Sequence, residues 1–264
     1  MDGYGPGSYG EHFADVYDDW YGDVSDVAAT VTGVIELAAG GPILELGVGT
    51  GRLAIPLAAG GVDVVGVDAS PAMLDRLRAK EGGSAVTLIE ADMADPPVAA
   101  DHFALVFAAF NTFFNLTDDD AQRRCFANVA RALRPTGRLV IEGFVPPSEG
   151  LSDGGVSVRT ITTDRAVLSA SQHDPATQMI RGQHIDISAA GIRVRPWVVR
   201  YRTPEQLDAL ASATGFTLEA RLADWSGTPW SDGAENHISV YRLTGSAAAD
   251  APRGRGIGGN GQVG

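Results

Sequence analysis

One stretch of twelve residues, PILELGVGTGRL at positions 42–53, constrains the fold more than any other part of this chain. A short apolar run leads into Glu45, and glycines follow at alternate positions: Gly47, Gly49 and Gly51. Glycine accepts backbone conformations with positive φ and lets a ligand approach without meeting a Cβ. A strand, a tight glycine turn and the start of a helix, in that order, predict a nucleotide-binding turn.

A second carboxylate stands where such a turn requires one. The apolar run VDVVGVD ends at Asp68, seventeen residues after Gly51. A carboxylate at the end of the second strand can accept hydrogen bonds from both hydroxyls of a ribose. Strand, glycine turn, helix, strand and Asp68 form one ordered set, which favours a nucleoside site over an ordinary glycine loop.

The glycine spacing leaves two kinds of cofactor open. A nicotinamide site has the pattern G-x-G-x-x-G/A. Read from Gly47 the last position is Arg52, which fails, but read from Gly49 it is Ala54, which fits. Glu45 tilts the choice, because a carboxylate beside the turn suits a cationic ligand and would repel a pyrophosphate.

The sequence E-L-G-V-G-T-G (45–51) resembles motif I of the class I S-adenosylmethionine-dependent methyltransferases. Their pattern, acid-x-G-x-G-x-G, is met at Glu45 and at the three glycines. S-adenosylmethionine carries a sulfonium and an amino group and has no phosphate, in keeping with Glu45. The resemblance implies that this molecule is the cofactor and that Asp68 and Ala69 lie at its ribose.

Further cofactor-binding residues follow from the same resemblance. The family's adenine-binding stretch matches EADM at 90–93, where Asp92 would accept the exocyclic amine and Met93 would meet the ring. Met73 would lie against the adenine and Phe110 near the reacting methyl. In the family an N-terminal Y-D-x-x-Y segment forms a lid, which here contains Tyr17 and Tyr21. The candidate positioning residues for the acceptor are Tyr17, Tyr21 and Asn115.

The order of the elements indicates the fold class. Helical periodicity and caps predict helices over 25–39, 51–59, 72–80, 118–133 and 207–214, with Pro56 expected to shorten or kink the second of them. Apolar runs predict strands ending at Asp68 and spanning 86–89, 103–110, 138–144, 216–222 and 237–243. This α/β alternation predicts a Rossmann-like, doubly wound, mostly parallel sheet, seven-stranded with an antiparallel last strand as in the family. Glu45, Asp68, Asp92 and Phe110 all fall at predicted carboxyl ends of strands, where such sheets bind ligands.

The pattern changes after Pro146. Four β-rich runs with turn signals between them predict an antiparallel β insertion over 150–202. A similar arrangement occurs in bacterial sugar N-methyltransferases. Its seven arginines could form a solvated face, meet an anionic group of the substrate, or contact a partner subunit and so form a homodimer. The predicted organisation is a methyltransferase domain over 11–145 and 203–244, the insertion as substrate cover or subunit contact, and disordered tails at 1–10 and 245–264.

Composition excludes several classes of partner. The formal net charge is −13 and the pI about 4.7, which argues against nucleic acid and against an anionic membrane surface. No apolar run approaches the roughly 18 residues of a transmembrane helix. The N-terminus lacks a signal-peptide pattern, and one cysteine excludes a disulfide framework. We therefore expect a cytoplasmic protein with a small-molecule acceptor and no metal.

The predicted activity is methyl transfer from S-adenosylmethionine to a nitrogen or oxygen of a small molecule. The leaving group is already activated, so the protein mainly holds donor and acceptor in line. A general base is needed only when the acceptor is protonated or is a hydroxyl, and none of the five histidines lies in a strand-end motif. Two alternatives remain at this point: an NAD(P)-dependent oxidoreductase and a non-catalytic nucleoside-binding protein.

Overall fold

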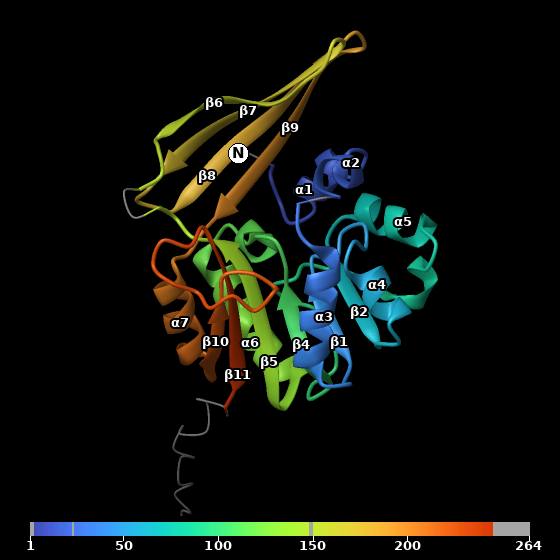
Figure 1. Ribbon diagram of the computed structural model, residues 1–264, viewed down its shortest axis with the longest axis vertical. Helices are drawn as coiled ribbons and strands as arrows, with labels where there is room; N and C mark the ends of the chain where they lie inside the picture. The colour runs from blue at the N-terminus through green and yellow to red at the C-terminus, as the bar shows by residue number, and fades with distance from the viewer. Residues whose placement is uncertain (1–2, 23, 148–149, 245–264) are drawn as a thin grey trace, which may run out of the picture.

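The computed structural model describes residues 3–22, 24–147 and 150–244, so the expected tail at 245–264 lies outside the described residues. It contains two β-sheets (Figure 1). Sheet A has seven strands in the spatial order β10-β11-β5-β4-β1-β2-β3. Its strands are β1 (Ile43–Leu46), β2 (Val64–Asp68), β3 (Thr87–Glu90), β4 (Phe103–Ala108), β5 (Leu133–Phe144), β10 (Phe216–Leu222) and β11 (Asn236–Leu243).

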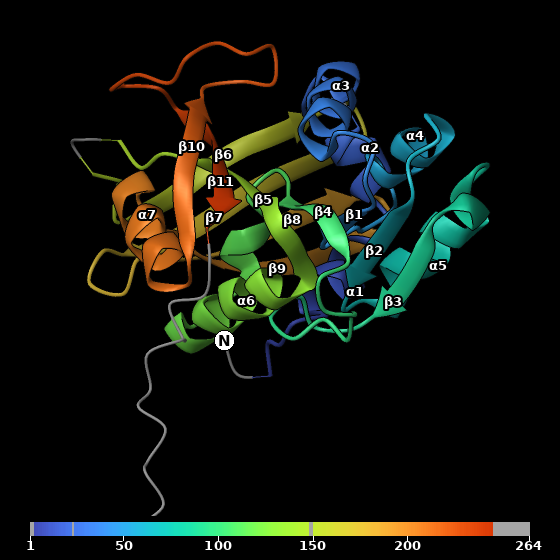
Figure 2. The same cartoon turned by 90° about the horizontal axis from the view of Figure 1, so that it is seen from below.

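Sheet A confirms the predicted fold class. β1, β2, β3, β4 and β5 pair in parallel, whereas β11 runs antiparallel to both of its neighbours. Helices cover both faces, with α3 and α6 on opposite sides of the sheet in Figure 2. The α-helices around sheet A are α3 (Val27–Ala38), α4 (Ala54–Ala59), α5 (Pro71–Ala79), α6 (Asp119–Ala132) and α7 (Pro204–Ala213), and short 3-10 turns lie at η1 (Gly83–Ala85) and η2 (Thr112–Asn115).

Each central strand contributes side chains to two hydrophobic cores, one on each face of sheet A. On β4, Leu105 and Phe107 join the core under α3, α4 and α5, whereas Val106 and Ala108 join the core under α6 and α7. Successive side chains of a strand point to opposite faces, so a strand buried on both faces must be apolar throughout. This explains why the central strands read as continuous apolar runs.

Two predicted helix starts are confirmed in atomic detail. The Ser70 hydroxyl accepts the backbone N–H of Met73, and Pro71 occupies the first helical position of α5. Thr203 and Gln206 form a capping box at the start of α7, with each side chain bonded to the other residue's backbone N–H. Such caps satisfy N–H groups that have no partner within the helix.

The helix after the glycine turn is shorter than predicted. It begins at Ala54 and not at Gly51, because Gly51 has a φ of 81° and so belongs to the turn. Pro56 is the third residue of this helix. The first N–H groups of a helix have no intrahelical acceptor, so a proline there removes no hydrogen bond. The helix is thus shorter than expected because of the turn at Gly51 and not because of Pro56.

Strand β4 also ends early, at Ala108 rather than Phe110. Phe110 and Asn111 both have positive φ, 44° and 62°, which breaks the strand. The Phe110 N–H donates to Oε2 of Glu142 at 2.8 Å, and Oδ1 of Asn111 accepts the N–H of Phe144 at 2.7 Å. Non-glycine residues in this region cost roughly 1–3 kcal/mol each unless their surroundings hold them, and these two bonds to β5 do so.

Sheet B confirms the predicted four-stranded antiparallel insertion and lies above the end of sheet A in Figure 1. Neighbouring strands pair in sequence order. The strands are β6 (Gly154–Ile161), β7 (Arg165–Asp174), β8 (Met179–Ser188) and β9 (Gly191–Arg200). Within the ranges given above, no helix is both long and apolar enough to cross a membrane.

The N-terminal prediction needs correction. Residues 1–10 were expected to be a disordered tail, but α1 (Ser8–Phe13) begins within that range and is followed by α2 (Tyr17–Tyr21). Gly10 packs so tightly against α5 that a Cβ would lie 2.3 Å from Cβ of Ser70. The aromatic rings of Tyr9 and Phe13 stack at 4.4 Å. Burial of these rings orders a segment whose glycine content suggested a tail.

Candidate active site

The glycine turn forms one wall of a pocket at the carboxyl ends of β1 and β2. Gly47 has a φ of 66° and approaches η2 so closely that a Cβ would lie 2.3 Å from Cγ2 of Thr112. Gly49, with a φ of 55°, has only the carbonyl oxygen of Gly47 near its missing Cβ, at 4.0 Å. The backbone at Gly49 is therefore open to a ligand, as the motif requires.

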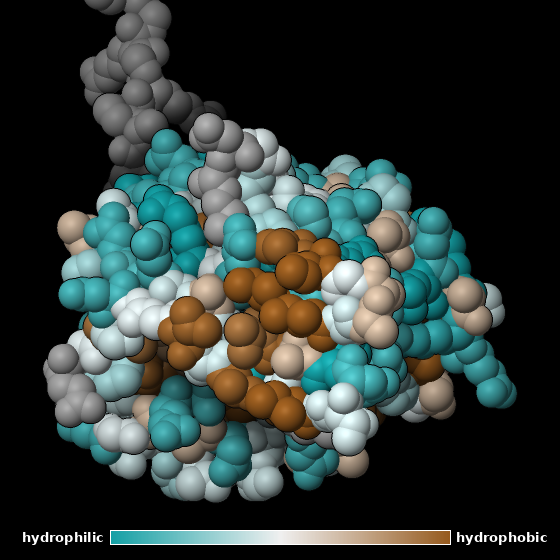
Figure 3. Space-filling view, turned by 90° about the horizontal axis from the view of Figure 1, so that it is seen from above, coloured by the Kyte–Doolittle hydropathy of each residue, from teal (hydrophilic) through white to brown (hydrophobic). Residues whose placement is uncertain are grey.

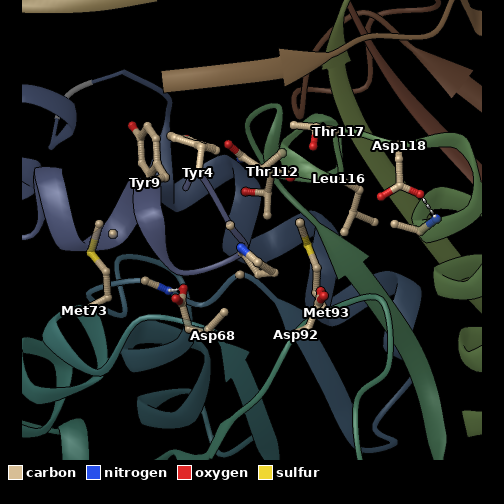
Figure 4. Close-up of a pocket in the computed structure, with 18 of the residues that line it drawn as sticks. Tyr4, Tyr9, Asp68, Met73, Asp92, Met93, Thr112, Leu116, Thr117 and Asp118 are labelled. Carbon is tan, nitrogen blue, oxygen red and sulfur yellow. Dashed lines mark hydrogen bonds between the residues drawn. The ribbon is translucent and has the colours of Figure 1, made fainter. Parts of the chain in front are cut away.

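Asp68 stands at the end of β2 beside this turn (Figure 4). Its Oδ2 accepts the N–H of Gly49 at 2.8 Å, and its Oδ1 accepts the N–H of Ser70 at 2.9 Å. Burial raises the pKa of Asp68, while the backbone N–H groups oppose that shift. The carboxylate thus holds together the two loops that flank the pocket.

Glu45 is buried behind the turn with a 4% exposed surface. Its Oε2 has no hydrogen-bond partner among the described residues. Burial raises the pKa of Glu45 to about 8, although the nearby Arg52 guanidinium opposes the shift. A buried, unpartnered carboxylate oxygen has a strong preference for a donor or a cation.

Most residues proposed from the sequence are brought together in this pocket. The pocket is lined by Tyr17, Gly47, Gly49, Asp68, Ala69, Met73, Asp92, Met93 and Asn115. Figure 4 shows Asp68 and Met73 on one side of it and Asp92 and Met93 toward the other. These residues come from α2, the turn after β1, the end of β2, α5, the turn after β3 and η2, so the fold gathers segments far apart in the sequence.

Four proposed residues lie outside the lining. Glu45 stands behind the turn, and Gly51 faces Leu77, whose Cγ would be 2.6 Å from an added Cβ. The Phe110 ring lies 6.2 Å from that of Tyr21, which in turn packs 5.0 Å from Tyr17. Phe110 and Tyr21 therefore support the pocket from behind Tyr17 and do not form its surface.

Sequence reasoning missed two groups of lining residues. The first comes from the N-terminal segment and comprises Tyr4, Gly5, Pro6, Tyr9 and Gly10. The second follows β4 and comprises Thr112, Leu116, Thr117, Asp118, Ala121 and Arg124. Two tyrosines in a glycine-rich start were the available signal for the first group. The start of α6, after a strand whose carboxyl end was already assigned to the site, was the signal for the second.

Helices α1 and α2 cover the pocket and are bonded to the rest of the molecule on both sides. Toward sheet A, Oδ1 of Asp18 accepts the Thr50 hydroxyl at 2.5 Å and Nζ of Lys80 at 2.8 Å. Toward sheet B, the guanidinium of Arg195 donates to both carboxylate oxygens of Asp15, at 2.6 and 2.9 Å. The lid is thus held between the glycine turn and the insertion.

The arginines of the insertion act largely within the chain. Arg195 is only 2% exposed, and Arg165 pairs with Asp186. The guanidinium carbon of Arg159 lies 5.1 Å from the ring centre of Trp20 on α2. The inner face of sheet B therefore binds the lid through charge pairs and cation–π contacts, while Arg159 and Arg193 also remain exposed to solvent.

The phenols of the pocket are protonated at neutral pH. Burial raises the pKa of Tyr4 and of Tyr17 to about 12 and that of Tyr9 well above its usual value. His184 lies outside the lining, where its ring contacts Phe13 at 5.7 Å between centroids. Burial lowers the pKa of His184 to about 4, so it is neutral between lid and sheet B.

Comparison with solved structures decides the family. The CcbJ methyltransferase from Streptomyces caelestis is 36% identical, with a TM-score of 0.85 over 92% of this chain and 100% of that one. The chain belongs to the class I S-adenosylmethionine-dependent methyltransferases. A family model described as a methyltransferase domain matches residues 43–137 of this methyltransferase, the part that contains the glycine turn.

Other relatives of the methyltransferase agree. The cypemycin N-terminal methyltransferase of Streptomyces sp is 28% identical over 195 residues, 72% of this chain and 78% of that protein. The sugar N-methyltransferase KedS8 from Streptoalloteichus sp is 25% identical, with a TM-score of 0.64 over 85% of this chain and 92% of that one. The cofactor is S-adenosylmethionine, and the nicotinamide and non-catalytic alternatives are set aside.

Proposed function

We propose that this enzyme transfers a methyl group from S-adenosylmethionine to an amine nitrogen of a small molecule. The observation that carries the proposal is the lining of the pocket: among the described residues that form it there is no histidine, and burial raises the pKa of its tyrosines, so that they are donors. A phenol in this state cannot remove a proton from a hydroxyl acceptor. An amine in its free-base form presents a lone pair and needs no such base.

The residues of the pocket fit S-adenosylmethionine. The unpartnered Oε2 of Glu45 suits the cationic end of this molecule, and the open backbone at Gly49 suits close approach. Asp68 would accept the ribose hydroxyls. Asp92 and Met93, on the other side of the pocket, would hold the adenine. The bound molecule supplies a methyl group on positively charged sulfur, which an attacking nitrogen can displace.

The chain's own contribution to the reaction is alignment. The pocket would hold the acceptor nitrogen facing the sulfonium methyl of the bound molecule, which would supply that methyl and leave as a neutral thioether, and the methylated nitrogen would release its proton to solvent. Asn115 donates its Nδ2–H to the Thr112 carbonyl at 3.1 Å, which leaves its amide oxygen to accept an N–H of the amine. Tyr17 and the lid exclude water and restrict the approach of the acceptor.

Two carboxylates of the lining are bonded to the backbone. Oδ1 of Asp92 accepts the N–H of Ala94 at 2.9 Å, and Oδ1 of Asp118 accepts that of Ala121 at 2.7 Å. These bonds fix the positions of both side chains in the pocket. The names of two relatives, an N-terminal methyltransferase and a sugar N-methyltransferase, point to nitrogen as well.

The test is a paired acceptor screen. Purified enzyme with S-adenosylmethionine is offered amino sugars and short amines, each beside the matching alcohol, and products are detected by mass as the gain of one methylene. We expect methylated products from the amine members only. Turnover of the alcohols, with the paired amines left unmethylated, would contradict the proposal.

A further inference from the structure

Helix α6 borders the pocket on the side of the turn that would hold the adenine. Sheet B lies above the lid, and Figure 3 shows its outward surface, where apolar side chains gather. Another border of the pocket belongs to α6, which contributes Ala121 and Arg124 to the lining. In Figure 2 the chain that follows β3 runs beside this helix. The helix is therefore placed to act on that turn.

The turn in question, residues 91–95 and called here the adenine turn, follows a strand at one edge of sheet A. β3 has four residues and pairs with β2, and the turn begins where the Ala91 N–H donates to the Asp68 carbonyl at 3.0 Å. An edge strand has a strand on one side instead of two, so it restrains the residues that follow it less than a central strand does. The bond from Ala94 fixes Asp92 within the turn, whereas the turn as a whole needs support from another element.

Two side chains on one face of α6 supply that support. Nδ2 of Asn128 donates to the Ala94 carbonyl at 2.9 Å and to Oδ1 of Asp95 at 2.7 Å. The amide group of asparagine has two hydrogens, so each of these acceptors receives its own. Nε of Arg124, four residues earlier on the helix, donates to Oδ2 of Asp95 at 3.2 Å. Residues four apart lie on the same face of a helix, so a single face of α6 holds the end of the adenine turn.

We propose that Asn128 is a positioning residue for the cofactor, which places the Asp92 carboxylate where it can accept the exocyclic amine of the adenine. The inference rests on the proposed function, in which Asp92 holds the adenine. Ala94 links the two side chains, because its carbonyl accepts from Asn128 and its N–H donates to Oδ1 of Asp92. Any shift of Ala94 therefore moves the carboxylate with it. Oδ1 is occupied by this bond, so Oδ2 of Asp92 is the oxygen that would accept the amine.

A positioning role and a merely structural role of Asn128 predict different results. If Asn128 only stabilised the fold, its loss would lower the melting temperature and weaken all nucleoside ligands of this pocket alike. As a positioning residue it matters most for a ligand with an exocyclic amine, because that is the group that meets Asp92. The informative quantity is therefore the preference of one protein for one of two ligands. Partial unfolding of a variant affects both dissociation constants equally and cancels in this ratio.

The test is isothermal titration of the full chain with S-adenosylhomocysteine and with S-inosylhomocysteine, in which a carbonyl oxygen replaces the exocyclic amine. The variants are Asn128→Ala and Asn128→Asp, the second of which keeps the shape of the side chain but turns a carboxylate oxygen toward the two acceptors. Asp92→Ala is the reference for loss of adenine recognition. The matched control is Arg131→Met, since Nη1 of Arg131 donates to the Val98 carbonyl at 3.0 Å, from the same helix but beyond the adenine turn.

The wild type and Arg131→Met should prefer S-adenosylhomocysteine by about 100-fold, because the inosine ligand loses a donor and sets an oxygen against a carboxylate. The preference should fall to about 10-fold in Asn128→Ala, further in Asn128→Asp, and to about twofold in Asp92→Ala. A wild-type preference in both folded Asn128 variants, together with its loss in Asp92→Ala, would overturn the positioning role alone. A wild-type preference in Asp92→Ala would show that the adenine assignment within the proposed function is wrong, and this inference would fall with it.

Discussion

Removal of the Asp68 side chain tests the cofactor site most directly. This carboxylate accepts the N–H groups of Gly49 and Ser70 at 2.8 and 2.9 Å, and we propose that the ribose hydroxyls donate to the same oxygens. Hydrogen bonds to a charged group contribute about 1.5–3 kcal/mol, and two bonds to one carboxylate are not additive. Asp68→Ala should therefore weaken binding of S-adenosylhomocysteine by roughly 10- to 150-fold.

Isothermal titration with S-adenosylhomocysteine measures this loss, and Glu90→Ala is the matched control. Glu90 lies opposite Asp68 in the β2–β3 register, but it is exposed and does not line the pocket. Its removal takes away the same charge from the neighbouring strand, and its dissociation constant should stay within about twofold of the wild type. The melting temperature of each ligand-free variant shows whether the fold is intact.

An Asp68→Ala variant with wild-type affinity and wild-type melting temperature would refute the ribose assignment. Equal weakening in Asp68→Ala and Glu90→Ala would mean that overall negative charge, and not two specific hydrogen bonds, favours the ligand. The structure predicts weakening only in Asp68→Ala, in a variant that still unfolds cooperatively although its melting temperature falls because two backbone hydrogen bonds are lost.

Three further predictions concern the turn, the buried acid and the lid. Gly49→Val should abolish detectable binding of S-adenosylhomocysteine in a calorimetric titration. A β-branched side chain resists a φ of 55° and would fill the open side of the pocket. Binding with wild-type affinity would contradict the assignment of this turn to the cofactor. Since the folded pKa of Glu45 is about 8, above the ordinary value of 4.5, the native state binds the extra proton between these limits. The stabilising effect of this proton is complete below about pH 4.5 and is lost as pH rises toward 8. The melting temperature measured from pH 5 to 8 should therefore fall more steeply for the wild type than for Glu45→Gln. Equal slopes in the two proteins would contradict the raised pKa of Glu45. Asp15→Ala should lower the melting temperature more than Arg195→Met. The first change leaves a 2% exposed guanidinium without its carboxylate, whereas the second leaves an exposed carboxylate that water can solvate. The reverse order of melting temperatures would show that burial does not control the strength of this pair.

Local chemistry accounts for what could be predicted from the sequence. The caps at Ser70 and Thr203 act within one helical turn, and the glycine turn needs positive φ at positions that only its own residues determine. The fold class followed from the alternation of apolar runs, because each run must bury its own faces. Asp68 and Asp92 could be placed because the ends of parallel strands meet at one edge of a sheet.

The errors arose where distant segments meet. A φ of 44° at Phe110 is held by Glu142 from another strand, and no local pattern reveals that support. Tyr4 and Tyr9 line the pocket only because α1 packs against α5, and that packing joins segments far apart in the sequence.

By itself the sequence determined the order of the elements and the nucleoside-binding glycine turn, since these depend on neighbouring residues and on burial of each run. Only the tertiary structure decided that the residues before the expected lid, Tyr4 and Tyr9 among them, also line the pocket. It alone separated the two faces of sheet B, because strand register across four segments sets one face, with His184, against the lid and leaves the other, with Ile192, exposed to solvent.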